Sequence, residues 1–447
     1  MNPINHLKLV PIPAHAYPHY RYAVQLQANK YDSQMGGVNT IADHVLVISQ
    51  ELNHYLAAQT VAMSREVTAL EQVLRGKAPN TLTLGRDKSL IGTLSKIARA
   101  AYQPEHHTRW MRFDFHLTTD GLAVSEVNAD VPAGTSESTE LAQIAWDYLA
   151  DTTLSVPQGI SVPIARSIKD TIERYHARKH QPLLPSYNVA LVYDQRHLDD
   201  IQVIKGLVPH LQQQGLNPVH VRPNQLTQRE GRIYQHHSQT PIHAIHRYYP
   251  AEWLAAYDHE MDTPGASDIY FTTDIPQSNH PTALLTQSKD NVLVAKAHGI
   301  DLPTISQHFP QTLPTTAYFG QVLRGRKNHY VAKPLYGRVG DGVSIPGVDS
   351  QQHQSAVLGD ILRYPRNWVF QQKFHSKPLR TTTSQPYHLL IGTFTVNNTF
   401  AGYYARLSHR AKFDEYAIDV PVLVATKLGE PHGKSKQARH FAKMGAQ

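Results

Sequence analysis

Apolar residues between Val38 and Leu74 recur at the spacing of one long amphipathic helix. Gly76 and Pro79 mark the end of this predicted helix. A second helical pattern runs from about Leu90 to Tyr102. The preceding residues 1–36 are rich in Pro, Tyr and His, and we predict that they pack irregularly over the rest of the chain.

From Trp110 to Leu117 the residues of a polar row alternate strictly with apolar ones, which predicts a strand with one polar and one apolar face. The polar row is Trp110, Arg112, Asp114 and His116, and the apolar row is Met111, Phe113, Phe115 and Leu117. Thr119-Asp120-Gly121 suits a three-residue hairpin loop. A loop centred on Asp120 places Asp114 opposite Glu126 and Arg112 opposite Asn128, whereas a loop one residue shorter breaks this register.

The predicted hairpin places two carboxylates, Asp114 and Glu126, face to face. Such carboxylates repel each other unless a cation lies between them. Together with Asn128 they form an all-oxygen set, which suits Mg²⁺ bound to a phosphate-bearing substrate. Arg112 could then hold a phosphate oxygen. The alternative is an exposed hairpin face that carries ordinary salt bridges.

After Asn128, residues 129–136 read as a loop with exposed hydroxyls and backbone amides, and residues 137–149 read as a helix. Such a helix start could bind an anion or carry a plain Ser/Thr cap. Further on, Val189–Tyr193, Asp199–Gln214 and Pro218–Val221 predict a strand, a helix and a second strand, which is a β-α-β unit. It has no Gly-x-Gly-x-x-Gly and therefore no dinucleotide signature.

A third region pairs lysines with a glycine-rich loop. Lys289 opens a predicted helix, and Tyr330–Lys333 is a short apolar strand that ends on a lysine. The loop that follows contains Gly337, Gly340 and Gly342. Backbone amides of such a loop and a strand lysine can together bind nucleotide phosphates, although a plain Gly-rich hairpin is the alternative.

Two more segments complete the pattern. Trp368–Phe374 alternates and predicts a strand that ends in a bend. His388–Val396 and Thr399–Arg406 predict a hairpin across Asn397-Asn398. Arg406 ends this hairpin, either facing a cleft or as an ordinary strand-end arginine.

Composition narrows the class of protein. The 447 residues are 41% apolar and 18% charged, and they include no cysteine, which excludes disulfides, thiolate metal sites and a cysteine nucleophile. No apolar run approaches the ~18 residues that span a membrane, and the N-terminus lacks a signal-like pattern, so we expect a cytoplasmic location. The net charge of +7 lies largely in a basic tail, and no basic-aromatic stripe suggests nucleic acid.

The sequence predicts a mixed α/β chain of four parts. They are residues 1–181, a helical region with the metal-site hairpin; residues 182–285, an α/β unit; residues 286–430, a nucleotide-binding unit; and residues 431–447, the basic tail. Nothing in the pattern fixes the oligomeric state.

The motifs and their order resemble those of the glutathionylspermidine synthase family, in its synthetase part with an ATP-grasp fold. Arg112-x-Asp114 and Glu126-x-Asn128-Ala-Asp130 resemble the family's Arg/Asp and Glu-x-Asn-Ala-Asp pair. Residues 247–253, Arg-Tyr-Tyr-Pro-Ala-Glu-Trp, are similar to its Tyr-Pro-Trp-Glu-Trp segment. Residues 331–340 resemble its Val-x-Lys-Pro-x-x-Gly-Arg-x-Gly loop, and the resemblance extends from about residue 105 to 425.

The resemblance implies ATP and Mg²⁺ as cofactors and a role for each matching residue. As Mg²⁺ ligands it implies Asp114, Glu126 and Asn128, and as catalytic arginines Arg112, at the transferring phosphate, and Arg406, at the acyl-phosphate step. It further implies that the nucleotide is bound by Lys289, Lys333, Gly337, Arg338, Gly340, Gly342, Gln371 and Gln372, the two glutamines lying at the adenine end.

The chain departs from the family pattern at several places. Gln372 stands where the family usually has Glu, Ala251 replaces an aromatic residue, and Leu-Ser-His-Arg after Arg406 is unlike the common continuation. These differences leave ATP chemistry in place but not the identity of glutathione or spermidine as substrates.

The resemblance implies an ATP-dependent ligase that joins a small-molecule or peptide carboxylate to an amine through an acyl phosphate. The alternatives are a nucleotide-binding regulatory protein without turnover and an ATP-grasp phosphotransferase that stops at phosphate transfer. ADP release that depends on both an acid and an amine would separate the ligase from the other two.

Overall fold

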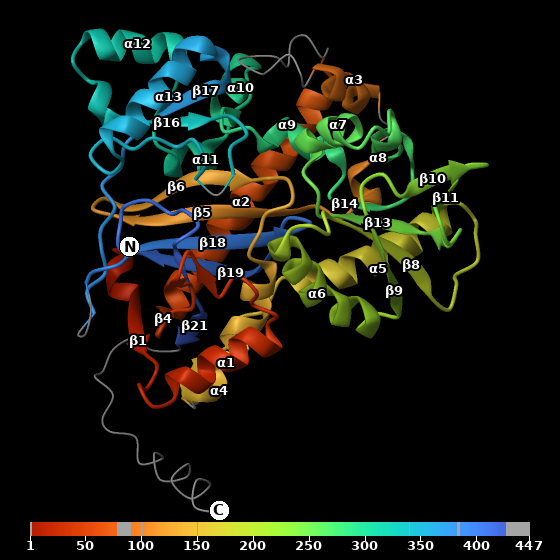
Figure 1. Ribbon diagram of the computed structural model, residues 1–447, viewed down its shortest axis with the longest axis horizontal. Coiled ribbons are helices and arrows are strands. Elements are labelled where there is room, and N and C mark those ends of the chain that lie inside the picture. Colours follow the sequence, from red (N-terminus) through yellow and green to blue (C-terminus); the bar gives the residue numbers. More distant parts are fainter. Residues whose placement is uncertain are drawn as a thin grey trace, which may run out of the picture.

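A central antiparallel sheet joins segments that lie far apart in the sequence. The computed structural model describes residues 2–77, 91–99, 102–149, 151–338, 340–381 and 385–425, so the predicted basic tail lies outside the described residues. The sheet has the order β20-β19-β18-β5-β6. Figure 1 labels its strands β19, β18, β5 and β6. Its strands are β5 (Trp110–Thr118), β6 (Gly121–Asn128), β18 (His388–Val396), β19 (Thr399–Ser408) and β20 (Ile418–Val420).

The predicted hairpin register is correct, but it arises differently from the prediction. The loop holds only Thr119 and Asp120, because Thr118 pairs with Gly121. A β-bulge at Ser125 then inserts one residue into β6, so that Asp114 faces Glu126 and Arg112 faces Asn128. The loop is one residue shorter than predicted, and the bulge adds one residue to β6. The two effects on the register cancel, so the polar and apolar rows keep their predicted faces.

The predicted helix from Val38 to Leu74 is wrong in its first third. Residues 44–49 form the strand β4 (His44–Ser49), and the helix α2 (Gln50–Arg75) begins only after Ser49. Every residue of β4 is buried. A strand buried on both faces is a continuous apolar run, which periodicity cannot distinguish from a buried helix. The Ser49 hydroxyl accepts a hydrogen bond from the Leu52 amide at 3.1 Å and so caps α2.

The prediction that residues 1–36 pack irregularly is also wrong, because they contain a regular strand and a helix. β1 (Leu7–Pro11) pairs antiparallel with β4, and α1 (Tyr17–Gln27) follows it. The sheet has the order β1-β4-β21-β7, in which β21 (Val422–Ala425) lies parallel to β4 and β7 (Leu154–Ser155) completes the edge. Helix α2 packs between this sheet and the strands β18 and β19.

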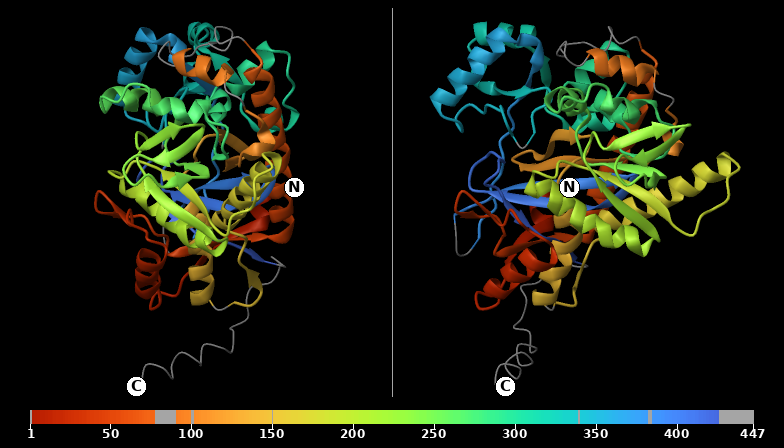
Figure 2. Two further views of the ribbon diagram at one scale, coloured as in Figure 1. Left: turned by 90° about the vertical axis from the view of Figure 1, so that its right-hand side faces the viewer. Right: turned by 45° about the vertical axis from the view of Figure 1, so that its right-hand side comes forward.

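The predicted β-α-β unit is confirmed and extended. β8 (Tyr187–Val192), α6 (Leu198–Gln213) and β9 (Leu216–Val221) lie in a parallel sheet of order β14-β13-β8-β9, with β13 (Ala244–Arg247) and β14 (Gln277–Ser278). Helices α5 (Ser161–Arg178) and α6 pack together beside it (Figure 2).

The loop at residues 129–136 is not exposed as predicted. The hydroxyls of Thr135 and Ser136 are buried, and Ser136 donates to the Gln202 carbonyl of α6. Gly206 permits this close approach, because a Cβ there would lie 2.6 Å from the Ser136 hydroxyl. The predicted helix that follows is present as a π-helical turn (Glu137–Leu141) and α4 (Ala142–Leu149).

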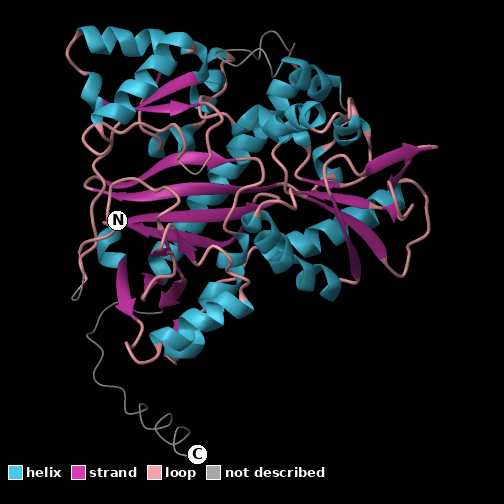
Figure 3. Ribbon diagram, viewed as in Figure 1, coloured by secondary structure: helices cyan, strands magenta, loops and turns pink. Residues whose placement is uncertain are grey.

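A small three-stranded sheet covers one end of the hairpin. Its order is β15-β17-β16, from β15 (Thr312–Pro314), β16 (Tyr330–Pro334) and β17 (Trp368–Gln372). Helices α12 (Thr315–Leu323) and α13 (Gln351–Arg363) accompany this sheet at one corner of the molecule (Figure 3). The predicted strands at residues 330–333 and 368–374 are thereby confirmed, and Lys333 lies on β16.

The helices and short strands that remain connect these parts. The helices are α3 (Ile91–Arg99), α7 (Ala251–Glu260), α8 (Ile269–Thr272), α9 (Leu284–Gln287), α10 (Asn291–Ala297) and α11 (Pro303–His308). The strands are β2 (Gln34–Met35), β3 (Val38–Asn39), β10 (Leu226–Arg229), β11 (Arg232–Gln235) and β12 (Pro241–Ile242). Short 3-10 turns occur at Pro3–His6, Pro104–His106, Ala266–Asp268, Pro281–Ala283, Lys327–His329 and Pro365–Asn367. The predicted hairpin across Asn397 and Asn398 is confirmed, and both residues have the positive φ, 49° and 59°, of a type I′ turn.

The cap of α2 gives a first prediction. Ser49→Ala removes the acceptor of the Leu52 amide and should lower the free energy of unfolding by about 1 kcal/mol. Ser49→Asp restores a capping oxygen next to the positive end of the helix and should recover most of this loss. Urea unfolding of the three proteins measures the effect. Equal losses in both variants would show that the hydroxyl contributes something other than the cap.

Candidate functional site

The polar face of the β5–β6 hairpin holds a tightly bound arginine and carboxylate. The Arg112 guanidinium donates to both oxygens of Asp114, at 2.7 and 2.9 Å, and to the Ala133 carbonyl at 2.6 Å. The Asn128 amide also donates to Asp114, at 3.0 Å. Asp114 is almost fully buried, so this pairing removes the cost of its isolated charge.

The opposing carboxylate has a partner from another part of the chain. Lys289, just before α10, lies 2.9 Å from the Glu126 carboxylate, and its ammonium also donates to the Gly337 carbonyl. The backbone amide of Lys289 donates to the Leu335 carbonyl at 3.1 Å. Lys289 thereby connects the hairpin to the glycine-rich loop that was predicted to act with it.

A second lysine is fixed by the β-bulge. Lys333, on β16, donates to the Ser125 carbonyl at 2.9 Å. Burial lowers the pKa of Lys333 to about 8, and the charge of Lys289 acts in the same direction, against the opposing effects of Glu126 and Asp114. A buried ammonium with a reduced pKa is poised for an anionic ligand.

The bulge residue also contacts a buried histidine. His116 lies 2.7 Å from the Ser125 hydroxyl, and burial lowers its pKa to about 3, with Lys333 acting in the same direction. The imidazole is therefore neutral at physiological pH. The prediction missed the Ser125 bulge, although the sequence contains a sign of it: Ser125 and Glu126 are consecutive polar residues between the apolar Val124 and Val127, which interrupts the alternation of β6.

The glycine-rich loop is anchored by Arg338. Its guanidinium donates to Glu252 at 2.8 and 3.1 Å, and lies over the Trp253 ring at 5.6 Å. The Arg338 guanidinium also donates to the backbone carbonyl of Asp130 at 3.4 Å. The carboxylate of Asp130 forms a fully buried ion pair with Arg247. The motif at residues 247–253 thus supports the loop rather than standing apart from it.

The three predicted loop glycines have specific backbone roles. Gly340 and Gly342 have φ of 71° and 67°, in the left-handed region that favours glycine. A Cβ on Gly337 would lie 2.5 Å from the Pro334 ring. Val339 lies outside the described residues.

A pocket lies beside Glu126 and Lys289, between the central sheet and the small sheet. Its apolar walls come from Val127, Val292, Ile305 and Phe309. Among its lining residues, three buried polar atoms have no hydrogen-bond partner: the Gln371 Nε2, the Ser288 hydroxyl and the Asn291 Oδ1. Unpaired buried donors and acceptors are costly, and such atoms converging on an apolar pocket are typical of a ligand site.

Gln371 and Gln372, the two glutamines expected at the adenine end, do not lie on the same face of the strand. They are consecutive on β17 and therefore point to opposite faces. Gln371 lines the pocket, whereas the Gln372 side chain is exposed to solvent.

Arg406 pairs with Asp419 rather than with the facing carboxylates Asp114 and Glu126. It is 3.3 Å from Asp419 and donates to the Ala417 carbonyl at 3.0 Å. Tyr404, two residues earlier on β19, lies beneath the Arg112 guanidinium at 5.1 Å from the ring centroid. Burial lowers the pKa of Arg406 and the nearby charge of Arg112 acts in the same direction, but Tyr404 and Asp419 outweigh both and leave that pKa raised.

The structure therefore brings most of the predicted residues into one site. Direct contacts or the shared pocket connect Arg112, Asp114, Glu126, Asn128, Lys289, Lys333, Gly337 and Gln371. Arg338, Gly340 and Gly342 lie on the loop beside it, Arg406 lies behind Tyr404, and Gln372 faces away.

Comparison with known proteins shows the family of the chain. The chain belongs to the glutathionylspermidine synthase preATP-grasp family, whose model matches residues 18–425. The match begins well before residue 105, where the sequence resemblance was expected to start, and so includes most of the N-terminal segment. The family indicates a ligase of the synthetase kind. No curated protein matches the chain in sequence.

A solved structure confirms the ATP-grasp-related α/β fold. The apo structure of a glutathione synthetase-like effector from Globodera pallida matches with a TM-score of 0.60 at 8% identity, covering 92% of this chain and 97% of that one. At this identity the match shows the fold alone. A putative gamma-glutamylcysteine synthetase from Methylobacillus flagellatus gives a TM-score of 0.37 at 12% identity, over 79% and 84% of the two chains, and carries no argument.

Within the described ranges, no helix combines the length and the apolar character needed to cross a membrane.

The Glu126–Lys289 pair gives a second prediction. Glu126→Gln removes the carboxylate but keeps its shape, so the metal-free protein should lose about 1–3 kcal/mol of unfolding free energy. The exposed Glu415→Gln is the control and should stay within about 0.5 kcal/mol of wild type. Thermal or urea unfolding in EDTA measures both. A more stable Glu126→Gln protein would show that repulsion from Asp114 outweighs the pair with Lys289.

Proposed function

We propose that the protein is an ATP-dependent carboxylate–amine ligase that forms an amide through an acyl phosphate. The observation that carries the proposal is the convergence of three cations, Arg112, Lys289 and Lys333, on the facing carboxylates beside a pocket with unpaired polar atoms. Cations from three separate elements around two acidic residues suit a phosphoryl group and its metal.

We propose one orientation for ATP. The adenine binds at the apolar pocket, where Gln371 can donate and Asn291 can accept, and where Val292 and Phe309 supply apolar walls. The pocket must widen to admit the base, because its enclosed space is about that of one water molecule. The phosphates then extend toward Lys289, Lys333 and the glycine-rich loop. Gln372 faces solvent, and this orientation gives its side chain no contact with the adenine.

The donor set also fits magnesium. Asp114, Glu126 and Asn128 supply carboxylate and amide oxygens, the ligands that Mg²⁺ prefers. When bound, Mg²⁺ neutralises charge on the phosphate oxygens and orients them.

The ion pairs of the site are compatible with a metal and a phosphate. Arg112 and Lys289 neutralise Asp114 and Glu126 in the structure. If the two carboxylates held Mg²⁺, Arg112 and Lys289 would be available to pair with phosphate oxygens. Exchange of one set of partners for another leaves no buried charge unpaired.

The reaction balances without a protein nucleophile. A substrate carboxylate oxygen attacks the γ-phosphorus of ATP, the bond to the β-phosphate oxygen breaks, and ADP leaves. The amine nitrogen then attacks the acyl carbon, an amide C–N bond forms, inorganic phosphate leaves and the amine loses a proton. In this proposal Arg112 stabilises the transferring phosphoryl group and Arg406 stabilises the acyl-phosphate step.

Turnover provides the direct test. Purified protein is incubated with Mg-ATP and a matrix of carboxylic acids and amines, including short peptides and polyamines, and ADP is measured. We expect release that requires both an acid and an amine, and Glu126→Gln should reduce it at least 100-fold. Release with an acid alone would indicate a phosphotransferase. Tight Mg-ATP binding without any release would indicate a regulatory protein.

The unpaired amide of Gln371 gives a third prediction, in which stability and binding move in opposite directions. Gln371→Met removes a buried donor without a partner, so the free protein should be as stable as wild type or more stable. The same change removes a contact to the adenine and should weaken Mg-ATP binding about 10-fold. Gln372→Met is the matched control on the opposite face and should leave the affinity unchanged. Calorimetry measures the affinity for Mg-ATP. Equal affinities of Gln371→Met and wild type would show that the adenine does not bind in this pocket.

The pKa of Lys333 gives a fourth prediction. In the free protein this ammonium titrates near pH 8, and a nearby phosphate raises its pKa. At pH 8 nucleotide binding should therefore take up about 0.5 proton at Lys333, and near pH 6 it should take up none there. Calorimetry in buffers of different ionisation enthalpy measures the difference, and Lys333→Met should abolish the uptake. Proton release at pH 8 in wild type would contradict the assignment.

A further inference from the structure

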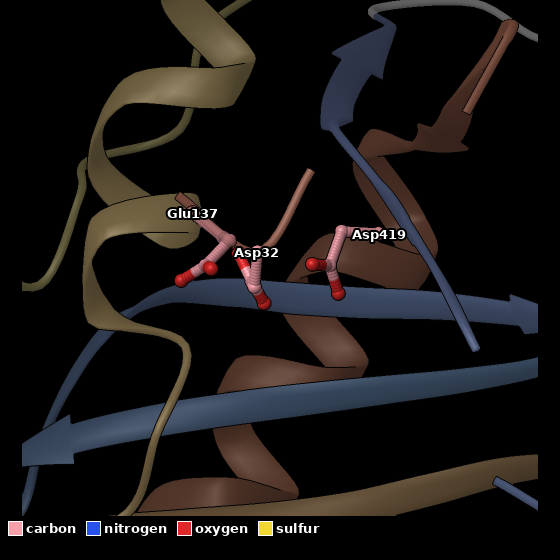
Figure 4. Close-up of side chains that lie close together, drawn as sticks. All are labelled: Asp32, Glu137 and Asp419. Atoms are coloured by element: carbon pink, nitrogen blue, oxygen red, sulfur yellow. The ribbon is translucent and has the colours of Figure 1, made fainter. Parts of the chain in front are cut away.

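A second buried charge cluster lies behind the site. The carboxylates of Asp32, Glu137 and Asp419 converge on one point (Figure 4). The ammonium of Lys30 fills that point, at 2.6 Å from Asp32, 2.9 Å from Glu137 and 2.6 Å from Asp419. Three carboxylates match the three N–H donors of an ammonium, so the lysine takes the place that a metal ion would need.

The cluster ties together three distant parts of the chain. Lys30 and Asp32 follow α1, Glu137 begins the π-helical turn before α4, and Asp419 lies on β20. The Lys30 side chain is fully buried. A buried ammonium is stable only with such compensation, which makes the cluster dependent on all three segments.

The cluster is connected to the catalytic arginines through Asp419. One Asp419 oxygen contacts Lys30, and the other accepts from the Tyr404 hydroxyl at 2.9 Å and lies 3.3 Å from Arg406. The Tyr404 ring in turn lies beneath the Arg112 guanidinium. The ring cannot shift toward Gly134, because even a Cβ at that glycine would come within 2.6 Å of it.

We propose that Lys30 is a positioning residue of the active site, which holds Asp419 so that Asp419 orients Arg406 directly and Arg112 through Tyr404. This inference rests on the proposed function and extends it, because it makes the N-terminal segment part of the phosphoryl-transfer site. Lys30 touches no substrate in this account. Its effect should appear when the transferring phosphoryl group is present and not when nucleotide binds alone.

The test compares two probes, Mg-ADP and Mg-ADP with aluminium fluoride, which mimics the transferring phosphoryl group. The main variant is Lys30→Met with Glu137→Gln, which removes one positive and one negative charge and leaves the net charge of the cluster unchanged. We expect its affinity for Mg-ADP to stay within twofold of wild type. Its affinity for the aluminium fluoride complex should fall at least tenfold, because Arg112 and Arg406 are no longer oriented.

Two variants control for unrelated effects. Lys205→Met removes an exposed lysine that donates to Tyr31 near the cluster, and both affinities should remain unchanged. Glu137→Gln alone leaves the Lys30–Asp419 contact in place, and it should weaken aluminium fluoride binding less than threefold.

A milder variant covers the case in which the double variant does not fold. Tyr404→Phe keeps the ring beneath Arg112 and removes only the hydrogen bond to Asp419. It should fold and should weaken the aluminium fluoride complex at least threefold with Mg-ADP binding unchanged.

Each outcome decides the question. Selective loss of aluminium fluoride binding supports the positioning role. Equal loss of both probes shows that Lys30 is only structural, and wild-type behaviour of the folded variants overturns the proposal. If the wild-type protein itself binds Mg-ADP no more tightly with aluminium fluoride, phosphoryl transfer is overturned and the positioning role falls with it.

Discussion

Two carboxylates that face each other in a buried sheet constrain the whole site. Asp114 and Glu126 are paired across β5 and β6, where the burial of Asp114 and the partial burial of Glu126 limit the screening of their repulsion by water. Each has received a cation from a different place: Arg112 from the same strand and Lys289 from the start of α10. The requirement for neutral charge thus determines which distant segments must meet at the hairpin, and the glycine-rich loop follows because it is bonded to Lys289.

The Ser125 bulge turns this requirement into a particular geometry. It restores the register of the two carboxylates, presents a carbonyl to Lys333 and a hydroxyl to His116. One inserted residue therefore sets the spacing of the acidic pair and the position of a lysine from the small sheet. Bulges commonly aim side chains in this way beside functional sites.

Much of the site could be predicted from the sequence, because alternation and local motifs carry its register. The facing of Asp114 and Glu126, the β-α-β unit and the Asn397-Asn398 hairpin all depend on short-range patterns. The helix boundary at Ser49 could not be predicted, since a strand buried on both sides has no polar face to reveal its period.

The long-range charge pairs were beyond prediction for a different reason. Lys30 and Asp419 are 389 positions apart, and nothing local to either residue shows that they meet.

The solvent exposure of Gln372 could have been found, because consecutive residues on a strand point to opposite faces.

The sheet order at the N-terminal end has a consequence for how the protein is made. β21 lies between β4 and β7, so residues 422–425 complete a sheet that begins at residue 7. A ribosome delivers the first strands long before it delivers this one, and the apolar edge of β4 stays open during nearly all of synthesis. Such an edge invites pairing with other chains. The nascent chain therefore carries an unpaired apolar strand edge until its last described strand emerges.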